Sequence, residues 1–308
     1  MVFEEGGWEL FAEINGARIF FDVEGKQFVP EGPVMKEKPV CFVVHGGPGC
    51  DHGDYCPVLS PLSDYMQLVY IDYRGNGRSE RTKKEEYTLD QNVEDIEGLR
   101  KYLGLDKIYL LGQSYGGYVG QAYGIRYPEN LSGLVLITTA CDHSVHEKGI
   151  AELEKLGTEE QIQMGKDYLW HGTFPNNEEY DRYYKVFMDL YSYKVRTGEV
   201  SREEVEEEIR RGIPSYDAVN QWFGGEQLTF DFREELHTIT CPTLVIGGRH
   251  DWVAPVSFTY EIADLIPKGK AVVMENSSHS VFTDEPEETL KEIISFILDH
   301  EKQREKGV

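Results

Sequence analysis

The sequence predicts an α/β protein with a mostly parallel sheet that begins with an antiparallel hairpin and is interrupted by one helical insertion. Short apolar runs rich in Val, Ile and Leu alternate with helix-favouring segments, as in a parallel sheet that is buried on both faces. This alternation stops between residues 141 and 235 and then resumes. We therefore expect a sheet domain formed by residues 1–140 and 236–308, with residues 141–235 as a helical insertion.

The first element is a hairpin. Between residues 8 and 29, two segments of alternating polarity flank Asn15-Gly16, a dipeptide that accepts the positive φ angles of a tight turn. The Pro, Gly and Lys residues that follow are expected to form a loop. The N-terminus is acidic and lacks the apolar run of a signal peptide, so export by that route is not expected.

Six apolar runs supply the remaining strands. They span residues 39–46, 67–75, 107–114, 131–140, 241–248 and 270–278. Thr88 and Gln91 have the spacing of a capping box for one intervening helix, and Tyr115 begins another. An amphipathic helix from Glu287 ends the chain.

Composition and charge exclude several classes of function. The 308 residues are 40% hydrophobic and 28% charged, which is typical of a globular protein. The 31 basic and 55 acidic side chains give a net charge of −24, which repels phosphate backbones and anionic lipids. No apolar run approaches the roughly 18 residues of a membrane span. Neither a nucleic acid nor a membrane partner is expected.

The five cysteines form an odd set without a C-x-x-C pair. This pattern argues against both a disulfide framework and a zinc site. We expect free thiols in a reducing compartment, the cytoplasm, and no metal or other cofactor.

A nucleophile motif lies where a predicted strand meets a predicted helix. Residues 112–116, Gly-Gln-Ser-Tyr-Gly, match the pattern G-x-S-x-G in this context. The turn would project the Ser114 hydroxyl from the top of the sheet, beside the N–H groups of a helix N-terminus. Ser114 is the predicted nucleophile.

A serine hydroxyl needs a neighbouring base that is held by an acid. His279 follows the last predicted strand and is the candidate base, while Asp251 follows the strand before it and is the candidate acid. Asp142 also leaves the sheet edge after a strand, so it remains an alternative acid. The chain order Ser, Asp, His is the one found in α/β-hydrolases.

Residues 45–49, His-Gly-Gly-Pro-Gly, follow another strand and supply a candidate oxyanion hole. Developing negative charge needs preset N–H donors, and glycines allow the backbone to approach the substrate. The expected donors are the N–H groups of Gly47 and Tyr115, with Gly46 as the reserve.

These motifs carry a family resemblance. Together with the DYRGNGRS segment at residues 72–79 and the Asp251 and His279 segments, they resemble the proline iminopeptidase branch of the α/β-hydrolases, the prolyl aminopeptidases and their tricorn-interacting-factor-like relatives. The resemblance implies the α/β-hydrolase fold, with residues 141–235 as its cap. It also implies removal of an N-terminal residue, often proline, whose free amine is anchored by carboxylates.

The sequence departs from this pattern at one anchor. Some relatives carry a carboxylate two residues before the triad acid, and Arg249 stands there in this chain. Glu226 is the best remaining match to the other anchor, although it would equally fit as one more surface glutamate. Trp222 and Tyr183 of the insertion are the candidates to line the substrate pocket, although aromatic residues at helical spacing more often belong to the hydrophobic core.

Three functional hypotheses follow. The first is a serine hydrolase that cleaves an N-terminal amino acid, proline or similar, from small peptides, amides or arylamides through an acyl-enzyme. The second is a carboxylesterase or lactonase that uses the same triad on small acyl esters; Arg249 favours it and the HGGPG segment disfavours it. The third, a binding protein without catalysis, is disfavoured by the complete motif set.

The acidic charge is concentrated in the insertion. Residues 141–235 carry 22 acidic and 11 basic side chains, so their net charge is −11 of the total −24. An acidic cap would attract a substrate with a cationic amine. The run EEVEEEIRR supplies much of this charge, and a solvated helix face explains it equally well.

Overall fold

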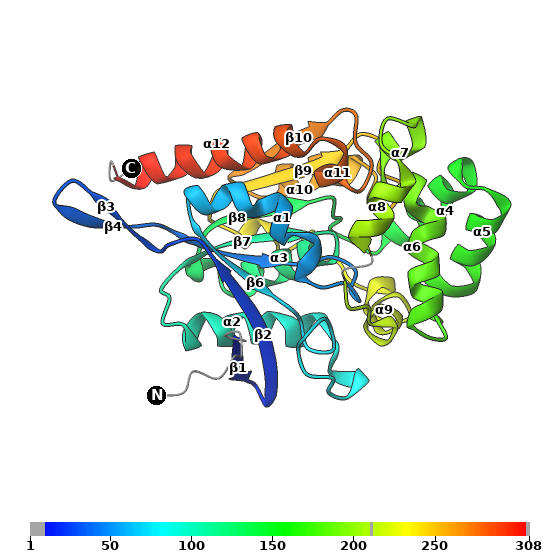
Figure 1. Ribbon diagram of the computed structural model, residues 1–308, viewed down its shortest axis with the longest axis horizontal. Coiled ribbons are helices and arrows are strands. Elements are labelled where there is room, and N and C mark those ends of the chain that lie inside the picture. Colours follow the sequence, from blue (N-terminus) through cyan, green and yellow to red (C-terminus); the bar gives the residue numbers. More distant parts are fainter. Residues whose placement is uncertain (1–9, 210–211, 306–308) are drawn as a thin grey trace.

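The computed structural model describes residues 10–209 and 212–305, and an eight-stranded sheet forms its centre (Figure 1). The strand order is β1-β2-β6-β5-β7-β8-β9-β10. The strands are β1 (Phe11–Ile14), β2 (Ala17–Glu24), β5 (Val40–Val44), β6 (Gln67–Ile71), β7 (Ile108–Gln113), β8 (Leu131–Ile137), β9 (Thr243–Gly248) and β10 (Gly269–Met274). All neighbours from β6 to β10 pair in parallel, whereas β1 and β2 are antiparallel. The predicted mostly parallel α/β sheet is confirmed.

The predicted N-terminal hairpin is confirmed as β1 and β2. Asn15 and Gly16 form its turn with φ angles of 48° and 78°, the combination that a type I′ turn requires. Residues 8 and 9, the start of the predicted hairpin, lie outside the described residues.

The loop predicted after this hairpin is wrong. Strands β3 (Phe28–Glu31) and β4 (Val34–Glu37) form a separate two-stranded sheet that projects from the body (Figure 1). All four residues of β4 are exposed. Because neither face of this sheet is buried, the sequence shows no alternation of polarity that would reveal it.

Helices cover both faces of the main sheet. Helices α2 (Leu89–Tyr102), α3 (Tyr115–Arg126) and α10 (Ser257–Leu265) contribute to the core on one face, and α1 (Cys56–Leu59) and α12 (Pro286–Glu305) to the core on the other. Strand β5 contributes side chains to both cores, because successive residues of a strand point to opposite faces of the sheet. Phe42 and Val44 belong to the first core, and Cys41 and Val43 belong to the second.

Only half of the predicted capping box is formed at α2. The Thr88 side chain accepts the Gln91 N–H at 3.2 Å. The Gln91 side chain donates instead to Asp95, four residues further along the helix.

The insertion between β8 and β9 is helical. It contains α4 (Ser144–Leu156), α5 (Glu159–Met164), α6 (Asn177–Tyr191), α7 (Tyr193–Thr197), α8 (Arg202–Ile209) and α9 (Tyr216–Phe223). These helices gather at one end of the sheet (Figure 1). Residues 210 and 211, the end of the acidic run, lie outside the described residues. Phe187 and Trp222 of the insertion join the same hydrophobic core as Tyr115 and Trp252, so the insertion and the sheet are packed together.

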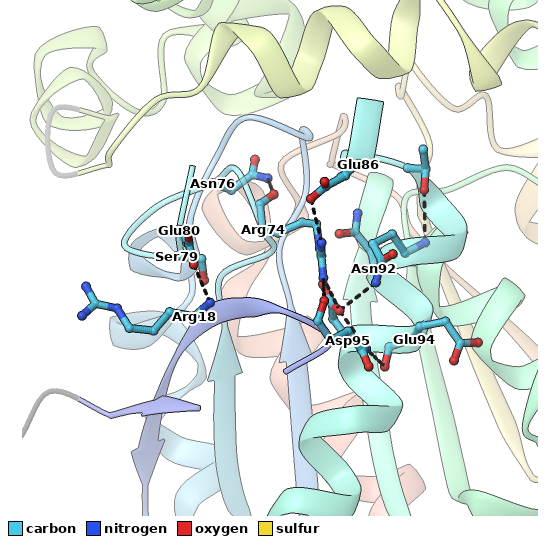
Figure 2. A network of polar contacts seen from close by, with 12 residues as sticks. Arg18, Arg74, Asn76, Ser79, Glu80, Glu86, Asn92, Glu94 and Asp95 are labelled. Atoms are coloured by element: carbon cyan, nitrogen blue, oxygen red, sulfur yellow. Dashed lines mark hydrogen bonds and ion pairs between the residues drawn. The ribbon is translucent and has the colours of Figure 1, made fainter. Parts of the chain in front are cut away.

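A buried ion pair fixes the loop that follows β6. The Arg74 guanidinium donates to both carboxylate oxygens of Asp95 on α2, at 2.6 and 2.8 Å, and to Glu86 at 3.2 Å (Figure 2). Further along this loop, Ser79 and Glu80 accept backbone N–H groups of β2. These contacts give Arg74 a structural role.

Candidate active site

Ser114 occupies the sharp turn between β7 and α3. Its φ angle is +54°, a conformation that residues other than glycine rarely adopt. The turn is possible only with glycines on either side, because a Cβ at Gly112 would lie 2.1 Å from the Gly116 oxygen. A Cβ at Gly116 would in turn lie 2.4 Å from the Val44 oxygen. The backbone of Ser114 is held by hydrogen bonds to β8 and to the Thr139 hydroxyl just beyond it.

His279 and Asp251 form a buried pair. The loop after β9 carries Asp251, and the loop between β10 and α11 (Val281–Asp284) carries His279. The His279 Nδ1 lies 2.9 Å from the Asp251 Oδ2, and the side chains are 8% and 0% exposed. The other Asp251 oxygen accepts the N–H groups of Val253 and Ala254. A proton on Nδ1 shared with Asp251 leaves Nε2 as the ring nitrogen that can accept a proton.

The serine turn and the histidine loop are directly connected. The side chain of Gln113, which precedes Ser114, donates to the His279 carbonyl oxygen at 3.0 Å. Because β7, β9 and β10 run in parallel within the sheet, their carboxyl ends bring Ser114, Asp251 and His279 to the same edge.

Asp142, the alternative acid, lies in different surroundings. One of its oxygens accepts the Ser144 N–H at 2.8 Å, and the other lies 3.9 Å from the Arg233 guanidinium. The carboxylate that contacts His279 is that of Asp251.

The loop at residues 45–49 lies against the serine. A Cβ on Gly46 would be 3.3 Å from the Ser114 Cβ. The Gly46 N–H donates to the Tyr55 hydroxyl at 3.0 Å, so it is already used within the protein. Of the expected oxyanion donors, Gly47 and Tyr115 are therefore better suited to a substrate than the reserve, Gly46. The buried His45 ring holds the loop through a 2.8 Å contact between Nδ1 and the Gly46 oxygen.

Cys50 directly follows this loop, and its sulfur lies 3.3 Å from the Tyr184 hydroxyl. Burial raises the pKa of the Cys50 thiol to about 12. A thiol nucleophile must be deprotonated to react. Cys50 is therefore a poor alternative to Ser114, and all five cysteines are free.

Aromatic side chains of the insertion contact the site, and the two residues predicted to line the pocket are themselves buried. Trp222 packs against the rings of Tyr115 and Tyr118, with centroids 5.0 and 5.1 Å apart. The Tyr183 hydroxyl lies 2.7 Å from that of Tyr191. Tyr191 itself packs edge-on against His279, with ring centroids 5.6 Å apart. Sequence reasoning missed Tyr191, although it belongs to the same Tyr-rich stretch.

Glu226 begins a 3-10 helix, Glu226–Leu228, after α9. Its carboxylate accepts the Leu89 N–H in the first turn of α2 at 2.8 Å. Burial raises the pKa of Glu226. The predicted amine anchor thus has one oxygen engaged by the backbone of α2.

Arg249 lies outside the buried pair. Its guanidinium binds the Glu275 carboxylate at 2.6 and 2.8 Å on the surface.

Within the described residues, Cys141, Asp142 and Glu261 bring three potential metal-ligand atoms within 4.8 Å of one another. Arg233 already supplies a positive charge beside that group.

Comparison with known proteins identifies the family. The alpha/beta hydrolase fold family matches residues 39–286. The proline iminopeptidase PfmaB of Pestalotiopsis fici is 32% identical over 293 residues, which cover 93% of this chain and 98% of that protein.

Solved structures share the fold. A proline iminopeptidase from Mycobacterium smegmatis has a TM-score of 0.72 at 19% identity, covering 95% of this chain and 98% of its own. An enol-lactonase from Burkholderia xenovorans has a TM-score of 0.69 at 20% identity, covering 94% and 100%. Since proteins with such different names share it, the fold does not assign the substrate. The family match and the identity to PfmaB over nearly the whole chain establish that the protein belongs to the alpha/beta hydrolase fold family, in its proline iminopeptidase branch.

Proposed function

We propose that the protein is a serine hydrolase that removes an N-terminal amino acid, proline or similar, from small peptides, amides or arylamides through an acyl-enzyme. The observation that carries the proposal is the buried 2.9 Å contact between His279 and Asp251 at the sheet edge that also bears Ser114. The 32% identity to a proline iminopeptidase supports the substrate class.

In the acylation step, the Ser114 Oγ attacks the carbonyl carbon of the first residue while its proton passes to the His279 Nε2. The new oxygen–carbon bond forms a tetrahedral intermediate, whose oxyanion accepts the N–H groups of Gly47 and Tyr115. The carbon–nitrogen bond then breaks, and His279 delivers its proton to the leaving amine.

Deacylation repeats this sequence with water. A water molecule gives a proton to His279 and its oxygen to the acyl carbon. The bond to Ser114 then breaks, and the proton returns to the serine oxygen. Asp251 keeps the imidazole in the required tautomer and stabilises its charged form throughout.

The substrate's free amine is expected to meet the acidic insertion. We assign residues 141–235 as a cap over a core of residues 1–140 and 236–308. Trp222 and Tyr183 would support the pocket through the rings that they contact. These are Tyr115 and Tyr118 for Trp222 and Tyr191 for Tyr183. Glu226 remains the candidate anchor for the amine through the carboxylate oxygen that Leu89 does not bind.

The cell compartment is part of the same proposal. We place the enzyme in the cytoplasm, because five free cysteines suit a reducing compartment. Within the described ranges, no helix is both long enough and apolar enough to cross a membrane.

One observation favours a second candidate, a carboxylesterase or lactonase with the same triad. Arg249 occupies the position that carries an amine-anchoring carboxylate in some relatives. Its guanidinium pairs with the Glu275 carboxylate. Without that carboxylate, a free amine on the substrate would contribute less to binding.

The test is a panel of prolyl, alanyl and leucyl arylamides, each with a free and an N-acetylated amino end, measured beside a simple lactone. We expect hydrolysis of the free forms and loss of most activity on acetylation. Equal rates on free and blocked substrates would refute the aminopeptidase, and a preference for the lactone would favour the second candidate.

A further inference from the structure

The loop that carries His279, here called the base loop (residues 275–280), is bound to the insertion on both sides of the histidine. The Ser278 hydroxyl donates to the Leu190 oxygen at 2.6 Å, and the Ser280 N–H donates to the Tyr191 oxygen at 2.9 Å. Both acceptors belong to the end of α6. The Tyr191 ring also packs against the ring of His279. One corner of the insertion therefore contacts the base loop at three successive residues.

Asp284, at the end of α11, completes this connection. Its side chain is fully buried. One oxygen accepts the Ser192 hydroxyl at 2.5 Å and the Lys194 N–H at 3.0 Å. The other accepts the Tyr193 N–H and the Ser278 N–H, each at 2.9 Å. A single carboxylate thus joins three donors of the α6–α7 corner to the residue that precedes His279.

Asp284 accepts all four of these hydrogen bonds, and together they restrict the position of the base loop. A buried carboxylate with four donors has little freedom to move, and the loss of its charge would leave N–H groups without an acceptor. The Ser278 N–H is fixed by Asp284, and the next residue is His279. The position of the imidazole therefore depends on a side chain that touches neither Ser114 nor Asp251 in any hydrogen bond described for this chain.

We propose that Asp284 is a positioning residue for His279, which sets the imidazole by tying the base loop to the α6–α7 corner of the insertion. The inference rests on the proposed role of His279 as the base. It adds that the insertion holds the catalytic histidine in place, in addition to covering the substrate.

The test is a double-mutant cycle of Asp284→Asn and His279→Ala, read out with p-nitrophenyl acetate. Asparagine keeps the shape of the side chain but turns an N–H toward donors that need an acceptor. We expect kcat of Asp284→Asn to fall about 10- to 100-fold with KM within about threefold, because small displacements of a catalytic group have such effects. In the His279→Ala background, the same substitution should change the rate by less than about twofold.

Glu97→Gln is the matched control, since the Glu97 carboxylate is also buried and also accepts several donors, Arg100 and Tyr123, none of which belongs to the base loop. It should leave kcat unchanged. A wild-type kcat for Asp284→Asn would overturn the proposal, as would an equal loss in both backgrounds, which would indicate a general structural role.

If Asp284→Asn does not fold, Ser192→Ala decides. It removes one of the four donors, so kcat should fall about threefold or more, and an unchanged kcat would overturn the proposal. Failure of the proposed function has a different signature. In that case His279→Ala itself would keep wild-type activity, or the ester would be cleaved and every aminoacyl arylamide left intact.

Discussion

Asp251 and Asp142 are both buried carboxylates that follow parallel strands, and they differ in what their oxygens meet. Asp251 contacts an imidazole, whereas Asp142 contacts a backbone N–H and lies near a guanidinium. We expect Ser114→Ala and Asp251→Asn to lower kcat by about a thousandfold or more, because members of a triad act as a unit. Asp142→Asn should stay within about threefold of wild type. Steady-state hydrolysis of the best arylamide measures all three variants, and a reversed order of the two Asn variants would move the acid to Asp142.

Glu226 offers a second test at this scale. Glu226→Gln keeps an oxygen for the Leu89 N–H and removes the negative charge. If the carboxylate anchors the amine, KM for free aminoacyl arylamides should rise about tenfold, with KM for p-nitrophenyl acetate unchanged. Glu234→Gln, an exposed glutamate of the insertion, controls for the change in net charge. An unchanged KM together with a lower melting temperature would mean that Glu226 only caps α2.

At the scale of elements, the local sequence was sufficient to predict the structure where a tight turn or a buried strand restricts the residue types. The Asn15-Gly16 turn and the glycines around Ser114 are such cases. The β3–β4 hairpin could not be predicted, because both of its faces are exposed and its residues carry no periodic pattern. Asp284 was missed for another reason. Its partner Ser192 lies 92 positions earlier, and no local pattern reports so distant a contact.

The segment after the loop at residues 45–49 contains a histidine–carboxylate pair that should make the stability of the fold depend on pH. His52 begins the 3-10 helix His52–Asp54, and its Nδ1 lies 2.7 Å from the Asp72 Oδ1 just beyond β6. Burial lowers the pKa of His52, but the hydrogen bond and the charge of Asp72 outweigh it and raise that pKa overall. The folded state therefore binds the His52 proton more tightly than the unfolded state.

The stabilisation from this pair should be complete below the unfolded pKa of about 6.5 and should be lost as pH rises through the folded pKa. We expect the free energy of unfolding of wild type to exceed that of His52→Gln by more at pH 5.5 than at pH 9. Urea unfolding at several pH values measures the difference, and His237→Gln, at an exposed histidine, is the control. A difference that grows with pH would contradict the assignment.

At the scale of the whole molecule, the insertion is joined to the loops that carry the proposed catalytic residues. It shares a hydrophobic core with the sheet and holds the base loop through Asp284. It also contacts the loop at residues 45–49 and the residues just after it, since the Ser215 N–H donates to the Gly49 oxygen and the Ile213 N–H to Asp51. The insertion, whose net charge is −11, thus contacts both loops that the proposed reaction needs.

This charge predicts how binding depends on salt. A cationic substrate is attracted to an acidic cap over distances comparable to the Debye length, which falls from about 30 Å at 0.01 M salt to about 3 Å at 1 M. For a free aminoacyl arylamide, KM should therefore rise several-fold between about 0.01 and 0.5 M salt, with kcat nearly constant. For neutral p-nitrophenyl acetate, KM should not change over the same range. Equal salt dependence for the two substrates would mean that the acidity of the insertion serves solubility and has no part in attracting the amine.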